Sequence, residues 1–157
     1  MPRGARRLPE ACLEQLRASD LIVHLGDFSE REVLDSLESL GPPVAAVHGN
    51  VDSAELCSQL PDELLVEAFG HRIALVHDAG PAAGRIGRMR RRFPDAEAVL
   101  FGHSHLPLVE REGGFAIFNP GSPTERRRAP VRSMGIVEAG SEGLDFKHLS
   151  FDGAPLP

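Results

Sequence analysis

The sequence has no long hydrophobic run, which excludes the usual signature of a membrane protein. A membrane-spanning helix needs roughly 18 or more consecutive apolar residues, and no stretch of the chain approaches that length. The basic residues near Met1 are not followed by the apolar segment that a secretory signal requires. We therefore predict a cytoplasmic protein that has no membrane among its partners.

Cysteine is scarce as well, since Cys12 and Cys57 are the only two and lie far apart. They provide neither a disulfide framework nor the paired spacing of a zinc knuckle, so we expect reduced thiols. The net charge of −6 argues against general binding of polyanions, and we do not expect nucleic acid as a partner. Arginines cluster at 88–92 and 126–128, which leaves room for local attraction of a phosphate group.

The chain has no internal repeat and no low-complexity linker, so one domain over residues 1–157 is expected. Apolar runs that end at glycine predict buried strands, and apolar residues at helical spacing predict helices. The predicted helices cover 8–18, 29–40, 52–60 and 81–93. The predicted strands cover 21–25, 44–47, 64–69, 72–77, 98–101, 106–110, 115–118, 135–137 and 144–149.

The order of these elements indicates the fold class. Strands and helices alternate in the first half, where Ser29 with Glu32 and Asp52 with Glu55 are the predicted capping pairs of two helices. Later strands are joined by tight turns, as in antiparallel hairpins. We predict an α/β fold in which two sheets pack face to face under outer helices, a four-layer α-β-β-α sandwich.

Side chains that can coordinate a metal come directly after the predicted strands. They are Asp27, Asn50, His77, His103 and His105. The carboxyl ends of strands form the functional crevice of open α/β sheets. Glycine stands directly before three of these residues, where it allows a sharp turn and a close approach of the backbone to a ligand.

The mixture of carboxylate, amide and imidazole donors favours borderline divalent ions over an all-oxygen Ca²⁺ site. We expect Mn²⁺, with Fe²⁺, Zn²⁺ or Ni²⁺ as alternatives. A carboxylate that bridges two such ions would build a clamp for attack by an activated hydroxide on phosphorus. The chemistry that this set predicts is hydrolysis of a phosphoester.

Each of these residues also has a simpler explanation when taken alone. Asp27 could cap a helix or turn, and Asn50 could adopt a left-handed loop conformation. His77 could be a packed histidine at the end of a strand. The coincidence of all these residues at successive strand ends favours the metal site.

Short motifs with this order and spacing resemble the calcineurin-like metallophosphoesterases, in particular the small phosphodiesterase branch that includes a retromer subunit of the same fold. The motifs are Leu-Gly-Asp at 25–27, Gly-Asn-Val-Asp at 49–52, Leu-Val-His at 75–77, Gly-His-Ser-His at 102–105 and Asn-Pro-Gly-Ser at 119–122. The resemblance implies that Asp27 bridges two ions. It further implies ligand roles for Asn50, His77 and His103 at the second ion, for His105 at the first ion, and catalytic roles for Asp27 and Asn50.

One motif of that family is absent, namely a first apolar strand that ends in Asp-x-His and supplies two ligands to the first ion. The first ion would then keep only Asp27 and His105, fewer than the three protein ligands of a typical catalytic zinc. A missing central strand should also leave a gap in the core and unpaired neighbours. Two explanations stay open: the natural protein begins before Met1, or the chain is truly short and its catalysis is impaired. We favour the first, because the loss of a buried strand should cost more free energy than the stability margin of a domain.

The sequence thus predicts a metal-dependent phosphodiesterase that hydrolyses a small phosphoester with two ions, or with one ion if the first site fails. The alternative is a catalytically impaired member of the family that acts as a protein interaction module. Arg126, Arg127 and Arg128 follow the Asn-Pro-Gly-Ser motif and are candidates for holding an anionic substrate. The spacing of residues does not identify the substrate or the oligomeric state.

Overall fold

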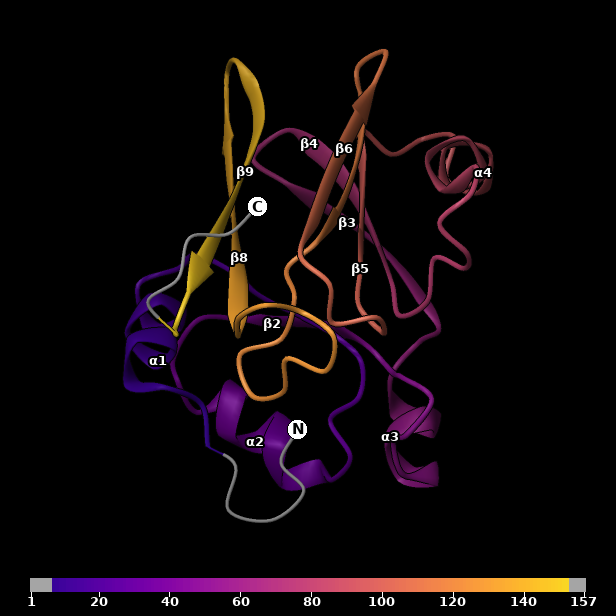
Figure 1. The fold of residues 1–157 in the computed structure, drawn as a ribbon. Coiled ribbons are helices and arrows are strands. Elements are labelled where there is room, and N and C mark those ends of the chain that lie inside the picture. The colour runs from indigo at the N-terminus through magenta and orange to yellow at the C-terminus, as the bar shows by residue number, and fades with distance from the viewer. Residues whose placement is uncertain (1–6, 153–157) are drawn as a thin grey trace.

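The strands form two small sheets and one larger sheet in the computed structural model, which describes residues 7–152 (Figure 1). The parallel pair contains β1 (Ile22–Leu25) and β2 (Val44–Val47). The mixed five-stranded sheet has the order β3-β4-β5-β7-β6, with β3 (Glu63–Ala68), β4 (His71–Val76), β5 (Ala98–Phe101), β6 (Leu108–Glu112) and β7 (Phe115–Asn119). The third sheet is the hairpin of β8 (Ser133–Gly140) and β9 (Gly143–Ser150).

The four helices are α1 (Glu10–Arg17), α2 (Arg31–Glu38), α3 (Ala54–Gln59) and α4 (Arg85–Arg92) among the described residues. α4 packs on the outer face of the five-stranded sheet, where Met89 joins Val76, Val99 and Ile117 in one apolar cluster. The helices α2 and α3 cover β2, where Leu34 and Leu56 pack with Ala46. Figure 1 shows α4 on the side of the molecule opposite to α1 and α2.

A central apolar cluster joins the five-stranded sheet to both small sheets. Leu75, Leu100 and Phe118 of the large sheet pack against Leu25 of β1, and Val137 of β8 packs against the same cluster. β1–β2 and β8–β9 therefore share one layer, with the large sheet beneath it. The predicted α/β sandwich of four layers is confirmed.

The helix starts differ from the sequence prediction. α2 begins at Arg31 and has Glu30 at its N-cap without a side-chain cap bond, so the predicted role of Ser29 is wrong. Ser29 has φ of 73° and belongs to the loop after β1. At α3 the hydroxyl of Ser53 accepts from Leu56 N, because Asp52 is engaged elsewhere. Several residues near each helix start, among them Ser, Asp and Glu, could serve as the N-cap. Which one does so depends on contacts with distant loops.

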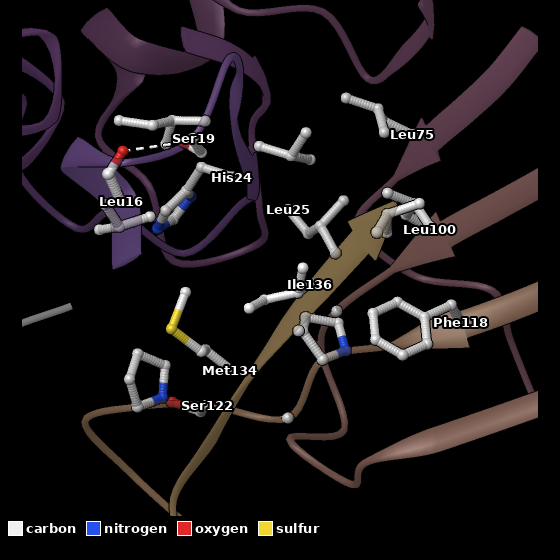
Figure 2. Close-up of a pocket in the computed structure, with 18 of the residues that line it drawn as sticks. Leu16, Ser19, His24, Leu25, Leu75, Leu100, Phe118, Ser122, Met134 and Ile136 are labelled. Carbon is white, nitrogen blue, oxygen red and sulfur yellow. Dashed lines mark hydrogen bonds between the residues drawn. The ribbon is translucent and has the colours of Figure 1, made fainter. Parts of the chain in front are cut away.

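A cavity of about 840 Å³ lies between β1 and β8 (Figure 2), and we call it the β1–β8 cavity. Within residues 7–152, β1 pairs only with β2 and β8 pairs only with β9. The gap and the unpaired neighbours that we expected in this layer are therefore present. Asp27, His77, His103 and His105 are among the residues that line the cavity, so it reaches four of the five predicted metal ligands.

Two observations bear on the expectations from composition. Among residues 7–152, no helix is long and apolar enough to cross a membrane, since the longest have 8 residues. Both cysteines are free thiols, with Cys12 buried and Cys57 exposed.

Candidate metal centre

The loops of the site approach one another so closely that two glycines are required. A Cβ on Gly26 would lie 2.6 Å from Gly49 N and 2.7 Å from His77 Nδ1. A Cβ on Gly49 would lie 2.3 Å from both the backbone N and Oδ1 of Asp27. Such distances are far inside van der Waals contact, so only glycine lets the loops after β1 and β2 touch.

Three of the five predicted ligands have left-handed backbone conformations. The φ angles are 65° for Asp27, 62° for His103 and 59° for His105. A residue with a side chain pays a conformational penalty in this region, and such residues concentrate at functional sites. The strained backbone therefore agrees with a ligand-binding role for these loops.

His77 is held in one orientation by the backbone of β1. Its Nδ1 lies 2.7 Å from the carbonyl oxygen of Leu25, and its side chain is only 9% exposed. Donation from Nδ1–H to this carbonyl leaves Nε2 of the neutral imidazole as an acceptor. This is the arrangement that orients a metal-binding histidine, with a second partner fixing the remote nitrogen.

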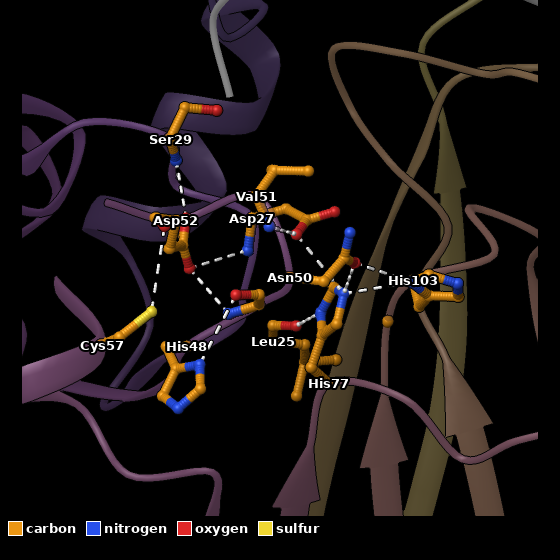
Figure 3. A network of polar contacts seen from close by, with 12 residues as sticks. Leu25, Asp27, Ser29, His48, Asn50, Val51, Asp52, Cys57, His77 and His103 are labelled. Carbon is orange, nitrogen blue, oxygen red and sulfur yellow. Dashed lines mark hydrogen bonds and ion pairs between the residues drawn. The ribbon is translucent and has the colours of Figure 1, made fainter. Parts of the chain in front are cut away.

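Three atoms that could coordinate a metal lie in front of His77 Nε2, which is the fourth (Figure 3). Asn50 Oδ1 lies 2.9 Å from His77 Nε2 and 3.0 Å from His103 Nδ1, while the two imidazole nitrogens are 3.2 Å apart. Asp27 Oδ1 lies 3.4 Å from His77 Nε2. We call these atoms of Asp27, Asn50, His77 and His103 the four-donor set.

The four-donor set has the spacing and the chemistry of a divalent ion site. Ligands that bind one ion at roughly 2.1 Å and at right angles to each other lie about 3.0 Å apart. The separations of 2.9, 3.0 and 3.2 Å among Asn50, His77 and His103 match this spacing, and Asp27 lies slightly farther, at 3.4 Å from His77. With its proton on Nδ1, His77 presents an acceptor to the oxygens of Asn50 and Asp27, so three acceptors face one another. A cation at their centre would remove this repulsion. Among the described residues, no three His, Cys, Asp or Glu side chains form a metal cluster by themselves, so Asn50 completes the set.

His105 has different surroundings, although it is close enough to Asp27 for their charges to interact. Its Nδ1 lies 2.8 Å from the carbonyl oxygen of Glu125, which leaves Nε2 directed elsewhere. Burial lowers the pKa of His105, and the nearby charge of Arg127 acts in the same direction. Asp27 and His105 are the two predicted ligands on this side.

Asp52 and Asn119 organise the site without belonging to the predicted ligands. The Asp52 carboxylate accepts hydrogen bonds from the backbone N–H of Asp27, Ser29 and Gly49, at 3.1, 2.7 and 2.7 Å. It thereby ties together the loops after β1 and β2. Sequence analysis gave Asp52 a capping role, which is wrong, although its place in the Gly-Asn-Val-Asp motif was a usable signal.

Asn119 holds the loop of residues 102–105 in place by hydrogen bonds, as Asp52 does for the loops after β1 and β2. Its side chain is fully buried, and its Nδ2 donates to Gly102 O and to Ser104 Oγ at 2.8 and 3.2 Å. Its Oδ1 accepts from Gly121 N at 2.9 Å. Asn119 of the Asn-Pro-Gly-Ser motif therefore contacts both neighbours of His103, the backbone of Gly102 and the side chain of Ser104.

The two arginine clusters differ in their contacts. Arg127 lines the mouth of the cavity, and its Nη1 donates to the carbonyl oxygen of His103 at 2.9 Å. Arg126 donates to Pro130 O, and Arg128 is exposed. On α4, by contrast, Arg88 donates to backbone carbonyls of the preceding loop, so that cluster includes structural contacts as well as a solvated face.

The comparisons with known proteins agree with this geometry. The sequence model of the calcineurin-like phosphoesterase superfamily domain matches residues 4–142. The chain belongs to this superfamily. A probable metallophosphoesterase of Methanothermobacter thermautotrophicus is 30% identical over 158 aligned positions, which cover 99% of this chain and 90% of the relative. The resemblance seen in the sequence motifs is confirmed.

Solved structures show the same fold at lower sequence identity. Wild-type Vps29 of Entamoeba histolytica complexed with Zn²⁺ is similar with a TM-score of 0.73 at 20% identity, over 97% of this chain and 94% of that chain. An archaeal phosphodiesterase is similar with a TM-score of 0.68 at 19% identity, over 89% and 90% of the two chains. This calcineurin-like phosphoesterase fold implies divalent metals.

Proposed function

We propose that this phosphoesterase is a metal-dependent phosphodiesterase that hydrolyses a small phosphoester in the cytoplasm. The four-donor set carries the proposal, because its atoms meet at the carboxyl ends of strands from two different sheets. The likeness to probable metallophosphoesterases and to an archaeal phosphodiesterase supports it. Two free thiols are compatible with a reducing compartment.

The four-donor set would hold one divalent ion, and we infer Mn²⁺ with Fe²⁺, Zn²⁺ and Ni²⁺ as alternatives. When bound, such an ion supplies neutralisation of phosphoryl charge and a lowered pKa for water. Two imidazoles with two oxygens suit this group of ions. Zinc as an alternative is supported by the Zn²⁺ complex of Vps29. Asp27 and His105 would be the protein ligands of a second ion.

The side chains of the chain itself position the phosphoester. Asn50 is exposed and turns its Oδ1 towards the imidazoles, so its amide N–H₂ remains to donate to a phosphoryl oxygen. Arg127 donates from Nη1 to His103 O, and its Nε lies 3.9 Å from the Glu125 carboxylate, so Nη2 remains to donate to an anionic oxygen. Asp27 and Asn50 are the proposed catalytic residues, with His77, His103 and His105 as further ligands.

Hydrolysis of generic substrates tests this proposal. Protein stripped of metal with a chelator is supplied with each ion in turn and assayed on bis(p-nitrophenyl) phosphate and on p-nitrophenyl phosphate. We expect Mn²⁺-dependent release of nitrophenol, faster from the diester. If the protein neither binds metal nor releases product with any of the supplied ions, the proposed enzymatic activity is refuted. Faster hydrolysis of the monoester than of the diester would refute the assignment as a phosphodiesterase.

A second candidate function is that of a protein interaction module with impaired catalysis. Two observations favour it: the fold likeness to Vps29, and the fact that Asp27 and His105 are the only ligands predicted for the first ion among residues 7–152. This candidate predicts that the protein binds an ion in the four-donor set and yet shows no turnover of either substrate. The hydrolysis assay combined with a metal titration separates the two functions.

A further inference from the structure

The loop that carries His103 and His105 has an unfavourable backbone conformation. The φ angles of these two residues are 62° and 59°. Residues with a side chain keep such angles only where the surrounding structure enforces them. The contacts of the loop of residues 102–105 should therefore include groups that fix it from outside.

Asn119 is one such group, and it is itself held by the β8–β9 hairpin. Its side chain binds Gly102 O and Ser104 Oγ, on either side of His103. The backbone carbonyl oxygen of Asn119 lies 2.7 Å from Nε2 of His148 on β9. A carbonyl can only accept a hydrogen bond, so His148 Nε2 carries a proton and donates it. His148 is thus linked to the loop of His103 through a single residue.

Packing brings the hairpin close to Asn119. The ring of His148 stacks on the ring of Phe118, with 4.6 Å between centroids and an angle of 27° between planes. Gly135 pairs with His148 across the hairpin, and a Cβ on Gly135 would lie 2.3 Å from the Phe118 ring. Because position 135 has no side chain, the hairpin lies close enough to β7 for the imidazole to reach the Asn119 carbonyl.

A second residue of the hairpin holds the same segment. Ser133 is fully buried, and its Oγ donates to Pro120 O at 2.9 Å. Its backbone N–H donates to Ser122 O at 3.0 Å. Together with His148, the hairpin therefore donates to three carbonyl groups within residues 119–122, and this segment cannot shift against the hairpin without losing hydrogen bonds.

We propose that His148 is a positioning residue of the metal centre, which fixes the loop of residues 102–105 through Asn119 and thereby the place of His103 Nδ1 in the four-donor set. The consequence for metal binding rests on the proposed function, whereas the fixing of the loop does not. The outer partners of metal ligands are worth roughly 10–100-fold in affinity. His148 acts through Asn119, so its effect belongs at the lower end of this range.

Substitutions of His148 separate its hydrogen bond from its packing. His148→Phe keeps a ring on Phe118 and removes the donor. His148→Gln keeps an amide nitrogen at the same number of bonds from Cα as histidine Nε2, and His148→Asn places this nitrogen one bond closer to Cα. Phe146→Leu is the matched control for packing, because the Phe146 ring lies 5.1 Å from the same Phe118 ring.

Titration with Mn²⁺ and hydrogen exchange of the metal-free protein test this inference on the intact chain. The exchange readout is the segment 102–106, in which the amides of Gly102, Ser104 and Leu106 are hydrogen-bonded. His148→Phe and His148→Asn should weaken Mn²⁺ binding about tenfold and speed exchange in this segment about fivefold or more, with β3 and β4 unchanged. His148→Gln and Phe146→Leu should stay within about twofold of the unmodified protein in both quantities.

Three results would overturn the inference. The first is unchanged exchange in residues 102–106 of His148→Phe. The second is a loss in His148→Gln or in Phe146→Leu as large as that in His148→Phe, because the hydrogen bond then does not explain the effect. The third is equally faster exchange in β3 and β4, which would indicate a general loss of stability.

Failure of the proposed function has a different signature. An unmodified protein that binds no Mn²⁺ would refute the metal site itself. The exchange rates of the metal-free variants would still confirm or refute the fixing of the loop by His148.

Discussion

The two sides of Asp27 differ in how completely the chain builds them. On one side, Asn50, His77 and His103 bring three donor atoms within 3.2 Å of one another. The other side is that of His105, which contacts the carbonyl oxygen of Glu125 and lines the β1–β8 cavity. The donor side is built from the loops after β2, β4 and β5. His105 also follows β5, but its Nδ1 lies 2.8 Å from the carbonyl oxygen of Glu125.

Replacing one histidine on each side gives the largest expected contrast. His77→Ala should lower the affinity for Mn²⁺ on the order of 1,000-fold, since even the outer partners of metal ligands are worth roughly 10–100-fold. His105→Ala should change that affinity less than about threefold. Isothermal titration of each variant with Mn²⁺ measures both effects.

His71→Ala is the matched control for this pair, because His71 begins the same strand that His77 follows. It contacts Glu97 and Gly140 O and lies away from the four-donor set. Its affinity for Mn²⁺ should equal that of the unmodified protein. If His77→Ala and His105→Ala lose the same affinity for Mn²⁺, the distinction between the two sides is wrong.

The stability of the protein should depend on pH because of His24, which lines the β1–β8 cavity. Burial lowers the pKa of His24 from 6.5 to about 3. Between these values the unfolded chain binds a proton that the folded chain does not, so the free energy of unfolding falls as the pH drops below 6.5. The loss should reach about 3 kcal/mol at pH 4.

His24→Phe keeps an aromatic ring on Phe28 and removes the titrating group. Urea unfolding at pH 7 and pH 4 should show that this variant loses about 3 kcal/mol less than the unmodified protein. If both proteins lose the same free energy of unfolding between pH 7 and pH 4, protonation of His24 is not coupled to unfolding.

The close contact of the loops predicts a smaller effect on the donor side. Gly49→Ala places a methyl group 2.3 Å from Asp27, so the loops must separate. We expect a loss of about 1–3 kcal/mol in the free energy of unfolding, together with weaker binding of Mn²⁺. Gly140→Ala has nothing within 4 Å of the new methyl group and should change neither quantity. Urea unfolding and titration with Mn²⁺ measure the two effects, and equal losses in both variants would remove the role assigned to Gly49.

The smallest expected effect concerns the carboxylate that joins the loops. Asp52→Asn removes its charge and keeps one oxygen acceptor, so it should destabilise the protein by about 1 kcal/mol. Asp62→Asn is the matched control, because the Asp62 side chain is 86% exposed in its pair with His48 and should matter less than about 0.5 kcal/mol. Urea unfolding of the two variants should therefore rank them in this order, and the reverse order would contradict the role assigned to Asp52.

Much of the fold and the choice of candidate residues could be predicted from sequence. Short apolar runs that end at glycine located the strands to within a few residues, because burial and turn chemistry are local signals. The motif at 102–105 indicated a loop directly after a strand in the same way, and β5 ends at Phe101. The separation of β1 from β8 was also expected, because the sequence as given contains no Asp-x-His motif.

Contacts between distant loops could not be predicted from the sequence. The role of Asp52 depends on backbone N–H groups some 25 residues away, at Asp27 and Ser29. The capping residue of α3 followed from the same competition, since Ser53 caps the helix while Asp52 binds the loops. Likewise, the support that Asn119 gives to the loop of His103 becomes visible only when β5 and β7 are paired.

The stoichiometry of bound metal tests the central claim most directly. Protein stripped of metal is titrated with Mn²⁺, and bound ions are counted for the unmodified chain and for His103→Ala. The four-donor set predicts one tightly bound ion per chain and its loss in His103→Ala. Two equally tight ions, no bound ion, or an ion that survives His103→Ala would contradict the account.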